Sequence, residues 1–485
     1  MNVNPITRLD YPDPDVIRVE DTYYMVSTTM HFMPGCEILQ SFDLVHWEHV
    51  TYVYETLDHT DAQQLKSGQN IYGQGMWAAS LRYHEGRFYI CFVANDTRKT
   101  YLYTSEKIDG PWKKQLIEGF YHDGSLLFDE DGRNYIVYGN DEIWITELNE
   151  DLTAPKKDGL HRLLVSDHKN PELGYEGSHI QKINGYYYIF LVHSLRDRWM
   201  RTEACFYSDS LEGEFTGGDV LCDDRGYCGQ GVAQGGIVDT PDGKWYAMLF
   251  QDSGAVGRIP ILLPVTWKDH FPFFGQNGHV PEEIEVHSTR PGYIYQPLVG
   301  SDDFCNGLLP RWQFNHDPDP RYYHLDALQG TYTITTREVC TELTQAVNTL
   351  TQRMSYPSCA AEVTVDASAL KEGDVAGLCA LQGCYAAVGI TKHHGKYEVL
   401  MLDKKEDGIL DMTEGTVVES HQMDFRLEAD FCNMKDEARC YYRVNKGDWL
   451  PIGTVHKLYF KLDHFTGCRF GLFCYAAEET GGSAC

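Results

Sequence analysis

A hairpin pattern that recurs five times is the feature that most constrains the fold of this 485-residue chain. Each copy has an apolar stretch, a polar turn, and an aromatic pair or residue that opens a second apolar strand. The copies are DVIRVEDTYYMVST, SLRYHEGRFYICFV, SLLFDEDGRNYIVYG, HIQKINGYYYIFLV and GIVDTPDGKWYAMLF. Apolar and polar residues that alternate on both sides of an EG, DG or NG turn are typical of β-hairpins. The pattern therefore predicts a chain built from repeated hairpins.

The spacing of the copies predicts how the hairpins are arranged. Their last aromatic residues lie 65, 46, 53 and 58 residues apart, at Tyr24, Tyr89, Tyr135, Tyr188 and Tyr246. These intervals suit four-stranded propeller blades joined by loops of variable length. A β-sandwich also has strands at regular intervals, but it does not repeat one hairpin signature at blade length. We therefore predict an all-β chain that begins with a five-bladed β-propeller.

Equivalent positions in the five copies predict a site on the propeller axis. We counted back eleven residues from the aromatic in the first copy, whose turn is shorter, and twelve in the others. The residues found are Asp13, Trp77, Asp123, Glu176 and Gln234. Each acid alone would more often be a turn or loop residue. Three acids at one mouth repel each other and raise one another's pKa, which favours a functional site.

Three segments carry a family resemblance. In this order, YPDPD, HDGSLLFD and YEGSH resemble the signature segments of glycoside hydrolase family 43, five-bladed propeller enzymes that release xylose and arabinofuranose from hemicellulose. The resemblance implies that Asp13 is the general base, that Asp123 orients the acid and tunes its pKa, and that Glu176 is the general acid. It also implies that Arg258, in AVGRIP, faces the sugar hydroxyls; an ordinary surface ion pair is the alternative.

The implied reaction divides the work between these carboxyl groups. Cleavage passes through an oxocarbenium-like state, so the leaving oxygen needs a proton and the anomeric carbon needs a nucleophile. In the inverting mechanism that the resemblance implies, Asp13 activates water directly and no covalent sugar forms. We expect Glu176 to keep its proton near neutral pH, because Asp123 and partial burial disfavour a second negative charge.

Further residues are candidates for binding the sugar or a metal ion. Trp77 in the ring and Phe32, in TTMHFMPGC, are the aromatic residues predicted to floor the pocket. Gln234 stands where many relatives have a histidine that helps to hold a central metal ion. Because an amide offers a carbonyl oxygen but no imidazole, a structural calcium ion remains an open alternative. We expect no required cofactor and assign no metal.

The hairpin signature ends after VHSTRPGYIYQP, which predicts a domain boundary. We predict a catalytic propeller over residues 1–298 and a β-sandwich over residues 299–485. The segment WQFNHDPDPRYY resembles the start of the concanavalin-like jelly roll that follows the propeller in family 43 xylosidases, where a loop can narrow the pocket mouth. Segments such as CAAEVTVDA and RFGLFCYAA alternate as sandwich strands do. An independent sugar-binding module is the alternative.

Composition narrows the partners and the compartment. Lys and Arg total 41 against 71 Asp and Glu, and the resulting net charge of −30 repels nucleic acid and anionic membranes. No apolar run approaches the roughly 20 residues needed to span a bilayer. The 15 scattered cysteines favour free thiols in a reducing compartment. MNVNPITRLDYPDPD lacks the features of an export signal, so we expect a cytoplasmic protein and leave homo-oligomer formation open.

Together these observations predict an exo-acting, inverting glycosidase. Its substrate would be an oligosaccharide from hemicellulose, from which it would release terminal non-reducing β-D-xylosyl or α-L-arabinofuranosyl units. Two alternatives remain: a propeller that binds sugar without catalysis, and an arabinan-directed hydrolase of the same family. The three retained acids argue against the first. The choice between xylose and arabinofuranose stays open, because the two sugars present similar hydroxyl positions.

Overall fold

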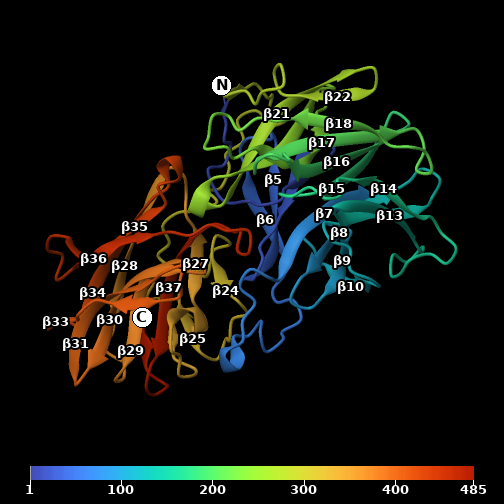
Figure 1. The fold of residues 1–485 in the computed structure, drawn as a ribbon. Coiled ribbons are helices and arrows are strands. Elements are labelled where there is room, and N and C mark those ends of the chain that lie inside the picture. The colour runs from blue at the N-terminus through green and yellow to red at the C-terminus, as the bar shows by residue number, and fades with distance from the viewer. Residues whose placement is uncertain (1) are drawn as a thin grey trace.

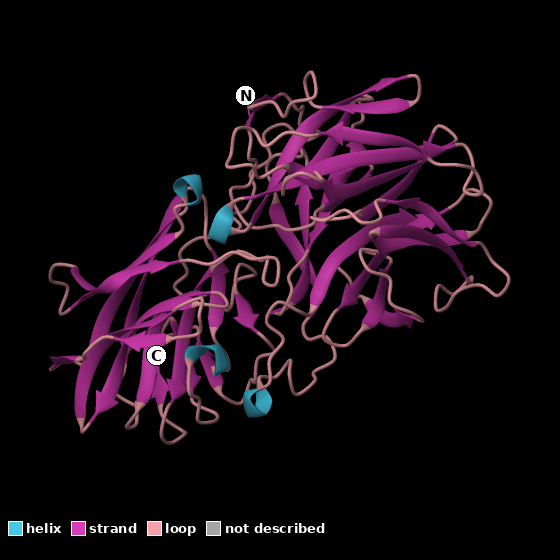
Figure 2. Cartoon of the chain, viewed as in Figure 1, coloured by secondary structure: helices cyan, strands magenta, loops and turns pink. Residues whose placement is uncertain are grey.

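Strands dominate the computed structural model, which describes residues 2–485 (Figures 1 and 2). Within these residues, helix is limited to four 3-10 turns, at η1 (Lys66–Gly68), η2 (Gly254–Val256), η3 (Leu343–Gln345) and η4 (Cys432–Met434). Figure 1 shows two regions: the blue to yellow-green part of the chain lies to the upper right, and the orange to red part to the lower left. No helix of the described residues is long and apolar enough to cross a membrane.

The first region contains five sheets, each of four antiparallel strands that follow one another in the chain. The first is β2 (Asp15–Val19), β3 (Thr22–Ser27), β5 (Gly35–Ser41) and β6 (Glu48–Tyr54). The second is β7 (Met76–His84), β8 (Arg87–Ala94), β9 (Lys99–Ser105) and β10 (Lys113–Ile117), and the third is β11 (Ser125–Phe128), β12 (Asn134–Asn140), β13 (Glu142–Leu148) and β14 (His161–Ser166). The fourth is β15 (Glu176–Ile183), β16 (Tyr186–Ser194), β17 (Arg201–Ser208) and β18 (Thr216–Leu221), and the fifth is β19 (Val232–Asp239), β20 (Trp245–Asp252), β21 (Arg258–Lys268) and β22 (Phe271–Phe274).

The five sheets form a closed ring. The first strand of each sheet contacts the first strand of the next, in the order β2, β7, β11, β15 and β19, and β19 returns to β2. A separate apolar cluster fills each of the five gaps between neighbouring sheets. Because burial of apolar area is the main favourable term in folding, each sheet depends on both neighbours. The ring places the start of each first strand near one axis.

The hairpins predicted from the sequence are present in all five sheets, as the pairs β2–β3, β7–β8, β11–β12, β15–β16 and β19–β20. Two of them have two-residue turns in which both residues take positive φ: Glu85 (47°) with Gly86 (78°), and Asn184 (50°) with Gly185 (85°). Such turns match the twist of the flanking strands. The EG and NG dipeptides of the sequence therefore fix the register of these hairpins.

The second region is a sandwich of curved sheets. Its largest sheet has the order β32-β31-β30-β29-β37-β27-β24-β4, with β33 also paired to β31. Those strands are β24 (Gln313–Asn315), β27 (Leu350–Arg353), β29 (Asp374–Leu381), β30 (Tyr385–His393), β31 (Lys396–Lys404), β32 (Leu410–Met412), β33 (Thr416–Val418), β37 (Arg469–Ala476) and β4 (Phe32–Met33). A four-stranded sheet of β28 (Ser358–Asp366), β34 (Gln422–Asp430), β35 (Glu437–Arg443) and β36 (Leu450–Lys457) packs on it across one apolar core. A small sheet joins β25 (Tyr323–Asp326), β26 (Thr331–Thr335) and β38 (Ser483–Ala484).

The two regions share structure where they meet. Strand β4 lies between β3 and β5 in the chain but pairs with β24. The largest sandwich sheet therefore has an edge strand that comes from the first region. The side chain of Arg353 crosses in the other direction: its Nε donates to the Asp10 carbonyl oxygen at 2.8 Å, and its NH1 lies 2.8 Å from Glu37 Oε2. A separate two-stranded sheet in the ring region pairs β1 (Asn2–Val3) with β23 (Glu283–Ile284). The predicted boundary at residue 298 falls between β23 and β24 and stays a prediction.

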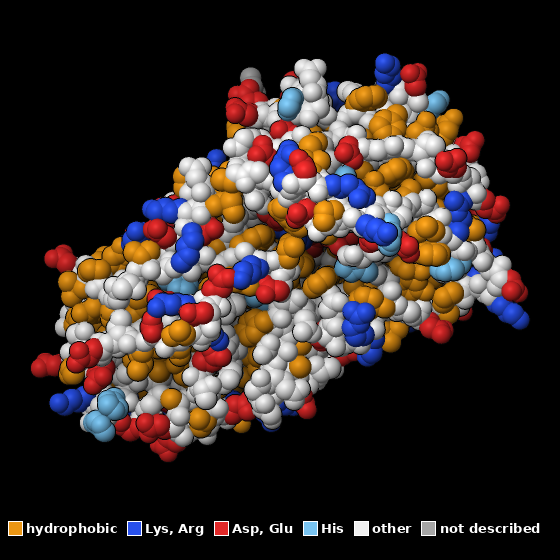
Figure 3. All heavy atoms as spheres, viewed as in Figure 1, with side chains coloured by type: hydrophobic (Ala, Val, Ile, Leu, Met, Phe, Trp, Pro, Cys, Tyr) orange, Lys and Arg blue, Asp and Glu red, His pale blue; other side chains and the backbone are white. Residues whose placement is uncertain are grey.

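Acidic side chains are not gathered in one patch. Figure 3 shows Asp and Glu side chains spread over both regions on the visible face. Acidic side chains on this face therefore do not mark a site by themselves, and the functional carboxylates must be found by burial and geometry.

Candidate active site

The three predicted carboxylates stand where first strands of the ring begin. Asp13 lies two residues before β2, Asp123 lies two residues before β11, and Glu176 is the first residue of β15. Asp13 and Asp123 take positive φ, 52° and 47°, and in the fourth sheet it is Gly177, at 65°, that does so. Such backbone is costly for residues other than glycine and clusters at functional sites. The sequence repeat pairs Asp13 and Asp123 with Glu176. By backbone conformation they pair with Gly177, one residue later.

Asp13 is buried, and both of its carboxylate oxygens are held. Its Oδ2 accepts a 2.6 Å hydrogen bond from the Thr28 hydroxyl, and its Oδ1 accepts one of 2.6 Å from NH1 of Arg258. Hydrogen bonds from a hydroxyl and a guanidinium stabilise the ionised form of a carboxyl group. This environment suits a group that must accept a proton.

Arg258 belongs to a buried chain of alternating charges. Its Nε donates to Asp252 Oδ1 at 3.2 Å, and Asp252 Oδ2 accepts from Nε of Arg201 at 3.1 Å. Burial acts to raise the pKa of Asp252, but the charges of Arg201 and Arg258 outweigh it and lower the pKa. Arg258 is 5% exposed, which excludes the surface ion pair that was its alternative. Its guanidinium instead fixes Asp13.

Asp123 and Glu176 meet around His122. Asp123 Oδ2 accepts the Gly177 backbone N–H at 2.9 Å, which ties the third sheet to the residue after Glu176. His122 Nε2 lies 3.4 Å from Glu176 Oε2 and 3.6 Å from Asp123 Oδ2. Asn140, at the end of β12, donates to Glu176 Oε2 at 2.7 Å.

The protonation of this group differs from the expectation for Glu176. Burial, together with the charges of Glu176 and Asp13, raises the pKa of Asp123 to about 6 against the charge of His122. Burial acts to lower the pKa of His122, but Asp123, Glu176 and Asp13 outweigh it and raise the pKa to about 9. Burial would also raise the pKa of Glu176, yet the hydrogen bond and charge of His122, with more distant arginines, lower it. The sequence predicted a raised pKa at Glu176; the neighbouring imidazolium reverses the direction.

Two aromatic side chains lie beside the charged groups of the site, and they come from different regions. Trp77 lies edge-on to His122, with ring centroids 6.1 Å apart, and edge-on to Phe465, at 5.4 Å. Phe465 belongs to a loop of the sandwich, and its ring also lies 4.0 Å from the Arg258 guanidinium carbon. A sandwich loop therefore reaches the carboxylates, and Trp77 lies beside them as predicted.

Phe32 lies at the junction of the two regions. It is 1% exposed, forms part of β4, and its ring is covered by the Arg469 guanidinium at 3.5 Å. This position accounts for its burial through packing between the regions. Its role at the sugar stays a prediction.

Gln234 is buried, and its surroundings bear on whether a calcium ion could bind there. Its backbone N–H donates to Glu203 Oε2 at 2.7 Å, while Gln234 Oε1 and Glu203 Oε1 have no hydrogen-bond partner among residues 2–485. Burial raises the pKa of Glu203 well above its usual range. Amide and carboxyl oxygens are ligands that Ca²⁺ uses, but these two side chains offer fewer than the roughly six to eight oxygens that it takes, so the structural calcium ion stays an open alternative.

Around His122 the geometry alone would admit a metal ion. Its Nε2 and the nearest oxygens of Asp123 and Glu176 lie within 4.8 Å of one another. The sequence assigned no metal here, and this stays a prediction. The 3.4 Å contact of His122 Nε2 with Glu176 Oε2 is the basis for the acid–base roles assigned below.

The sequence reasoning missed six contributors to the site: His122, Asn140, Arg201, Phe465, Thr28 and Asp252. His122 had a local signal, since it precedes Asp123 within HDGS. The others have no motif of their own, and only packing brings them to the carboxylates.

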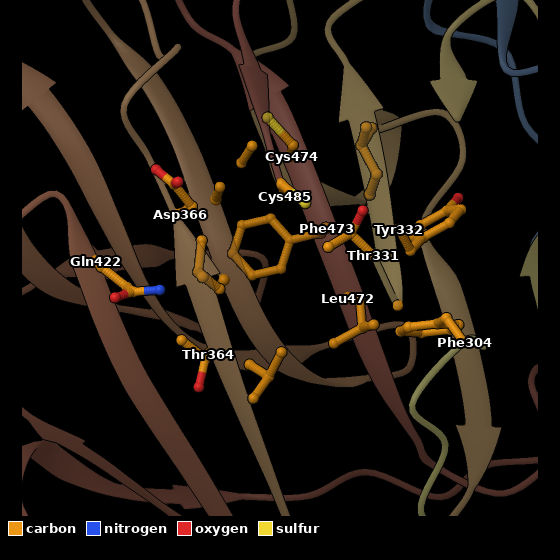
Figure 4. A pocket seen from close by; sticks show the side chains of 17 residues that line it. Phe304, Thr331, Tyr332, Thr364, Asp366, Gln422, Leu472, Phe473, Cys474 and Cys485 are labelled. Atoms are coloured by element: carbon orange, nitrogen blue, oxygen red, sulfur yellow. The ribbon is translucent and has the colours of Figure 1, made fainter. Parts of the chain in front are cut away.

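The sandwich also contains a cavity, of about 360 Å³, between its sheets. Figure 4 shows Phe304, Tyr332, Leu472 and Phe473 around it, with Asp366 and Gln422 toward one side. Asp366 is the one carboxylate among its lining residues. The cavity therefore lacks a pair of acids for acid–base chemistry.

Comparisons with known proteins agree for both regions. The family model described as "Glycosyl hydrolases family 43" matches residues 3–272, and that described as "Beta xylosidase C-terminal Concanavalin A-like domain" matches residues 301–485. The chain is 27% identical to a β-xylosidase of Formosa agariphila, over 99% of this chain and 88% of that protein. It is 26% identical to a non-reducing end α-L-arabinofuranosidase of Bacteroides ovatus, over 67% and 63%.

Solved structures resemble the whole chain. A bifunctional GH43-CE protein of Bacteroides eggerthii is 42% identical, with a TM-score of 0.92, over 100% of this chain. This chain spans 62% of the length of that protein. An engineered family 43 enzyme, described as having both endo-xylanase and exo-arabinofuranosidase activity, is 28% identical over 99% of this chain and 98% of its own, with a TM-score of 0.86.

Proposed function

Because this chain belongs to glycosyl hydrolase family 43, we propose that it is an exo-acting glycosidase that releases terminal xylosyl or arabinofuranosyl units from oligosaccharides. The observation that carries the proposal is that Asp13, Asp123 and Glu176 lie at one mouth of the ring. Their environments differ, because the pKa of Asp123 is raised and that of Glu176 is lowered. Relatives of this chain include a β-xylosidase and an α-L-arabinofuranosidase. A pair of carboxyl groups in different environments is what glycoside hydrolysis requires.

We assign the roles by environment. Asp13, held by Arg258 and Thr28, is the base that takes a proton from the attacking water. Glu176 gives a proton to the leaving oxygen, and Asp123 fixes the loop of Glu176 through the Gly177 N–H. With water as the direct nucleophile, the anomeric configuration inverts.

We also propose that the ring of five sheets is a five-bladed propeller whose axis carries the site. The closed order of first-strand contacts supports this arrangement. Exo action is supported by Phe465, which places a sandwich side chain against Trp77 and Arg258 and so walls one side of the mouth. A pocket closed on one side accepts a chain end and does not thread a polymer.

The compartment that we propose is the cytoplasm, with imported oligosaccharides as substrates. The 15 cysteines all lie within residues 2–485 and are free thiols there. Free buried thiols are normal in a reducing compartment.

The test is a side-by-side rate assay on aryl β-D-xylopyranoside and aryl α-L-arabinofuranoside. We expect turnover of at least one, and the ratio of the kcat/KM values gives the sugar preference. Proton NMR of the first-formed sugar then gives the anomer, and inversion is expected. A chain that binds xylo-oligosaccharides but turns over neither substrate would be a sugar-binding propeller, which would overturn the proposal.

A further inference from the structure

His122 lies beside the carboxyl groups of Asp123 and Glu176, and Glu176 is the proposed general acid. It lies in the loop that connects β10 to β11, and its carbonyl oxygen accepts the Gly139 N–H at 3.0 Å, which anchors the loop to β12. Its Nε2 is 3.4 Å from Glu176 Oε2. The His122 side chain is 20% exposed and that of Glu176 is 18% exposed, so water reaches both groups.

The charges around His122 favour the imidazolium. The charges of Asp13, Asp123 and Glu176, at the starts of β2, β11 and β15, raise the pKa of His122, whereas the charges of Arg201 and Arg258 help to lower that of Glu176. Trp77 meets the imidazole edge-on and carries no charge. The raised pKa of His122 and the lowered pKa of Glu176, with Nε2 and Oε2 3.4 Å apart, favour the proton on Nε2 of His122 in the free pocket. A general acid, however, needs that proton on Oε2.

We propose that His122 stores the catalytic proton and passes it from Nε2 to Oε2 of Glu176 when a bound oligosaccharide displaces water from the pair. This inference rests on the proposed function. The physical reason is desolvation: an ion pair loses more on removal of water than a neutral imidazole and a neutral carboxyl do. Hydrogen bonds of this kind are often long in an empty site and shorten when substrate binds, so 3.4 Å in the free pocket is compatible with transfer.

The proton count balances over one turnover. The N–H bond of Nε2 breaks and an O–H bond forms at Oε2 of Glu176. Glu176 then gives this proton to the glycosidic oxygen as the C–O bond breaks, and Asp13 takes a proton from the attacking water. After product leaves, Asp13 returns its proton to solvent and the neutral His122 takes one up, so no oxidant, reductant or further reactant is needed.

The test is the pH dependence of kcat/KM on xylobiose, or on the matching arabinofuranosyl oligosaccharide, for the intact chain and for His122→Gln. In the wild type the pair keeps its one proton until the pH approaches the raised pKa of His122, about 9. In His122→Gln only the carboxyl groups of Glu176 and Asp123 remain to hold the proton, and the pKa of Asp123 is about 6, so we expect the basic limb to move to lower pH by at least about one unit. An unmoved basic limb would overturn the proposal.

Two comparisons separate proton storage from a structural role. Asn140→Ala also removes a donor to Glu176 Oε2, but this donor has no proton to give, so the rate should fall without the same shift of the basic limb. On a dinitrophenyl glycoside, whose leaving group needs no proton, His122→Gln should keep a rate within about threefold of the wild type. A loss as large as that on xylobiose would mean that His122 serves only the architecture of the pocket.

A direct measurement covers the case in which His122→Gln does not fold. The ¹⁵N chemical shifts of His122 are measured in an Asp13→Asn variant, which holds substrate without turnover, and should report an imidazolium in the free variant and a neutral ring when xylobiose is bound. An imidazolium in both states would contradict proton storage. Failure of the proposed function looks different, because then the wild type itself would show no turnover.

Discussion

The carboxylate cluster at the mouth of the ring differs from the cavity of the sandwich, because only the cluster brings several acid–base groups together. At the mouth, Asp13 and Asp123 are buried, 3% and 7% exposed, and each accepts a hydrogen bond, from Arg258 and from the Gly177 N–H respectively. The sandwich cavity is lined mainly by apolar and aromatic side chains, with Asp366 as its one carboxylate (Figure 4). The comparison teaches that converging buried charge, and not the volume of a hollow, identifies the site.

The two regions nevertheless contribute residues to each other at their junction. The sandwich provides Phe465 to the pocket, and the ring provides β4 to the largest sandwich sheet. The ring therefore supplies the charges, and the sandwich supplies an apolar wall. Variants that separate these contributions test the comparison.

The largest effect is expected from Asp13→Asn. The amide cannot accept a proton from water, so kcat should fall by about three orders of magnitude or more on natural and on activated substrates. Steady-state kinetics on xylobiose and on a dinitrophenyl glycoside would measure it. The matched control is Asp366→Asn in the sandwich cavity, which makes the same chemical change. A comparable loss of activity in the control would contradict the distinction between the carboxylate cluster of the ring and the sandwich cavity.

Glu176→Gln should have a large effect that depends on the leaving group. Loss of the acid should lower the rate on xylobiose by about 10²–10⁴-fold, because the leaving oxygen departs without a proton. On a dinitrophenyl glycoside the loss should be less than about tenfold, since that leaving group needs no proton. Equal losses on both substrates would remove Glu176 from the role of acid.

Phe465→Ala tests the contribution of the sandwich. Removal of the ring opens the wall beside Trp77 and Arg258, and we expect kcat/KM to fall about tenfold, mainly through KM. Leu462→Ala, in the same loop but 46% exposed, is the control for the loop itself. If both variants behaved like the wild type, the sandwich would have no part in the pocket.

The smallest effect is expected on stability, from Asp123→Asn. Burial raises the pKa of Asp123 to about 6, so the folded state binds its proton more tightly than the unfolded state. The free energy of unfolding therefore falls as the pH rises from about 4 through 6, and at pH 7 the ionised group is a cost that the amide removes. We expect the variant to gain about 1–2 kcal/mol at pH 7 and little at pH 4, while activity is lost. Urea unfolding at both pH values would measure this gain, and a loss of stability at pH 7 would show that the Gly177 and His122 contacts outweigh desolvation.

The sequence by itself determined the hairpins, the ring and the three acids. Alternation with a period of two, and dipeptide turns such as Glu85–Gly86, act over a few residues, and their repetition places Asp13, Asp123 and Glu176 at one end of their sheets. Local rules were enough because equivalent positions in a closed ring converge whatever the loop lengths.

Only the tertiary structure decided which side chains surround those acids and how they are charged. The 3.4 Å approach of His122 to Glu176, which lowers the pKa of the acid instead of raising it, joins two neighbouring sheets. Phe465 reaches the pocket from the sandwich, and Phe32 is drawn to the junction by the pairing of β4 with β24. These contacts depend on how sheets pack across the ring and between the regions. No pattern within one strand encodes them, because electrostatic and packing energies depend on distance in space and not along the chain.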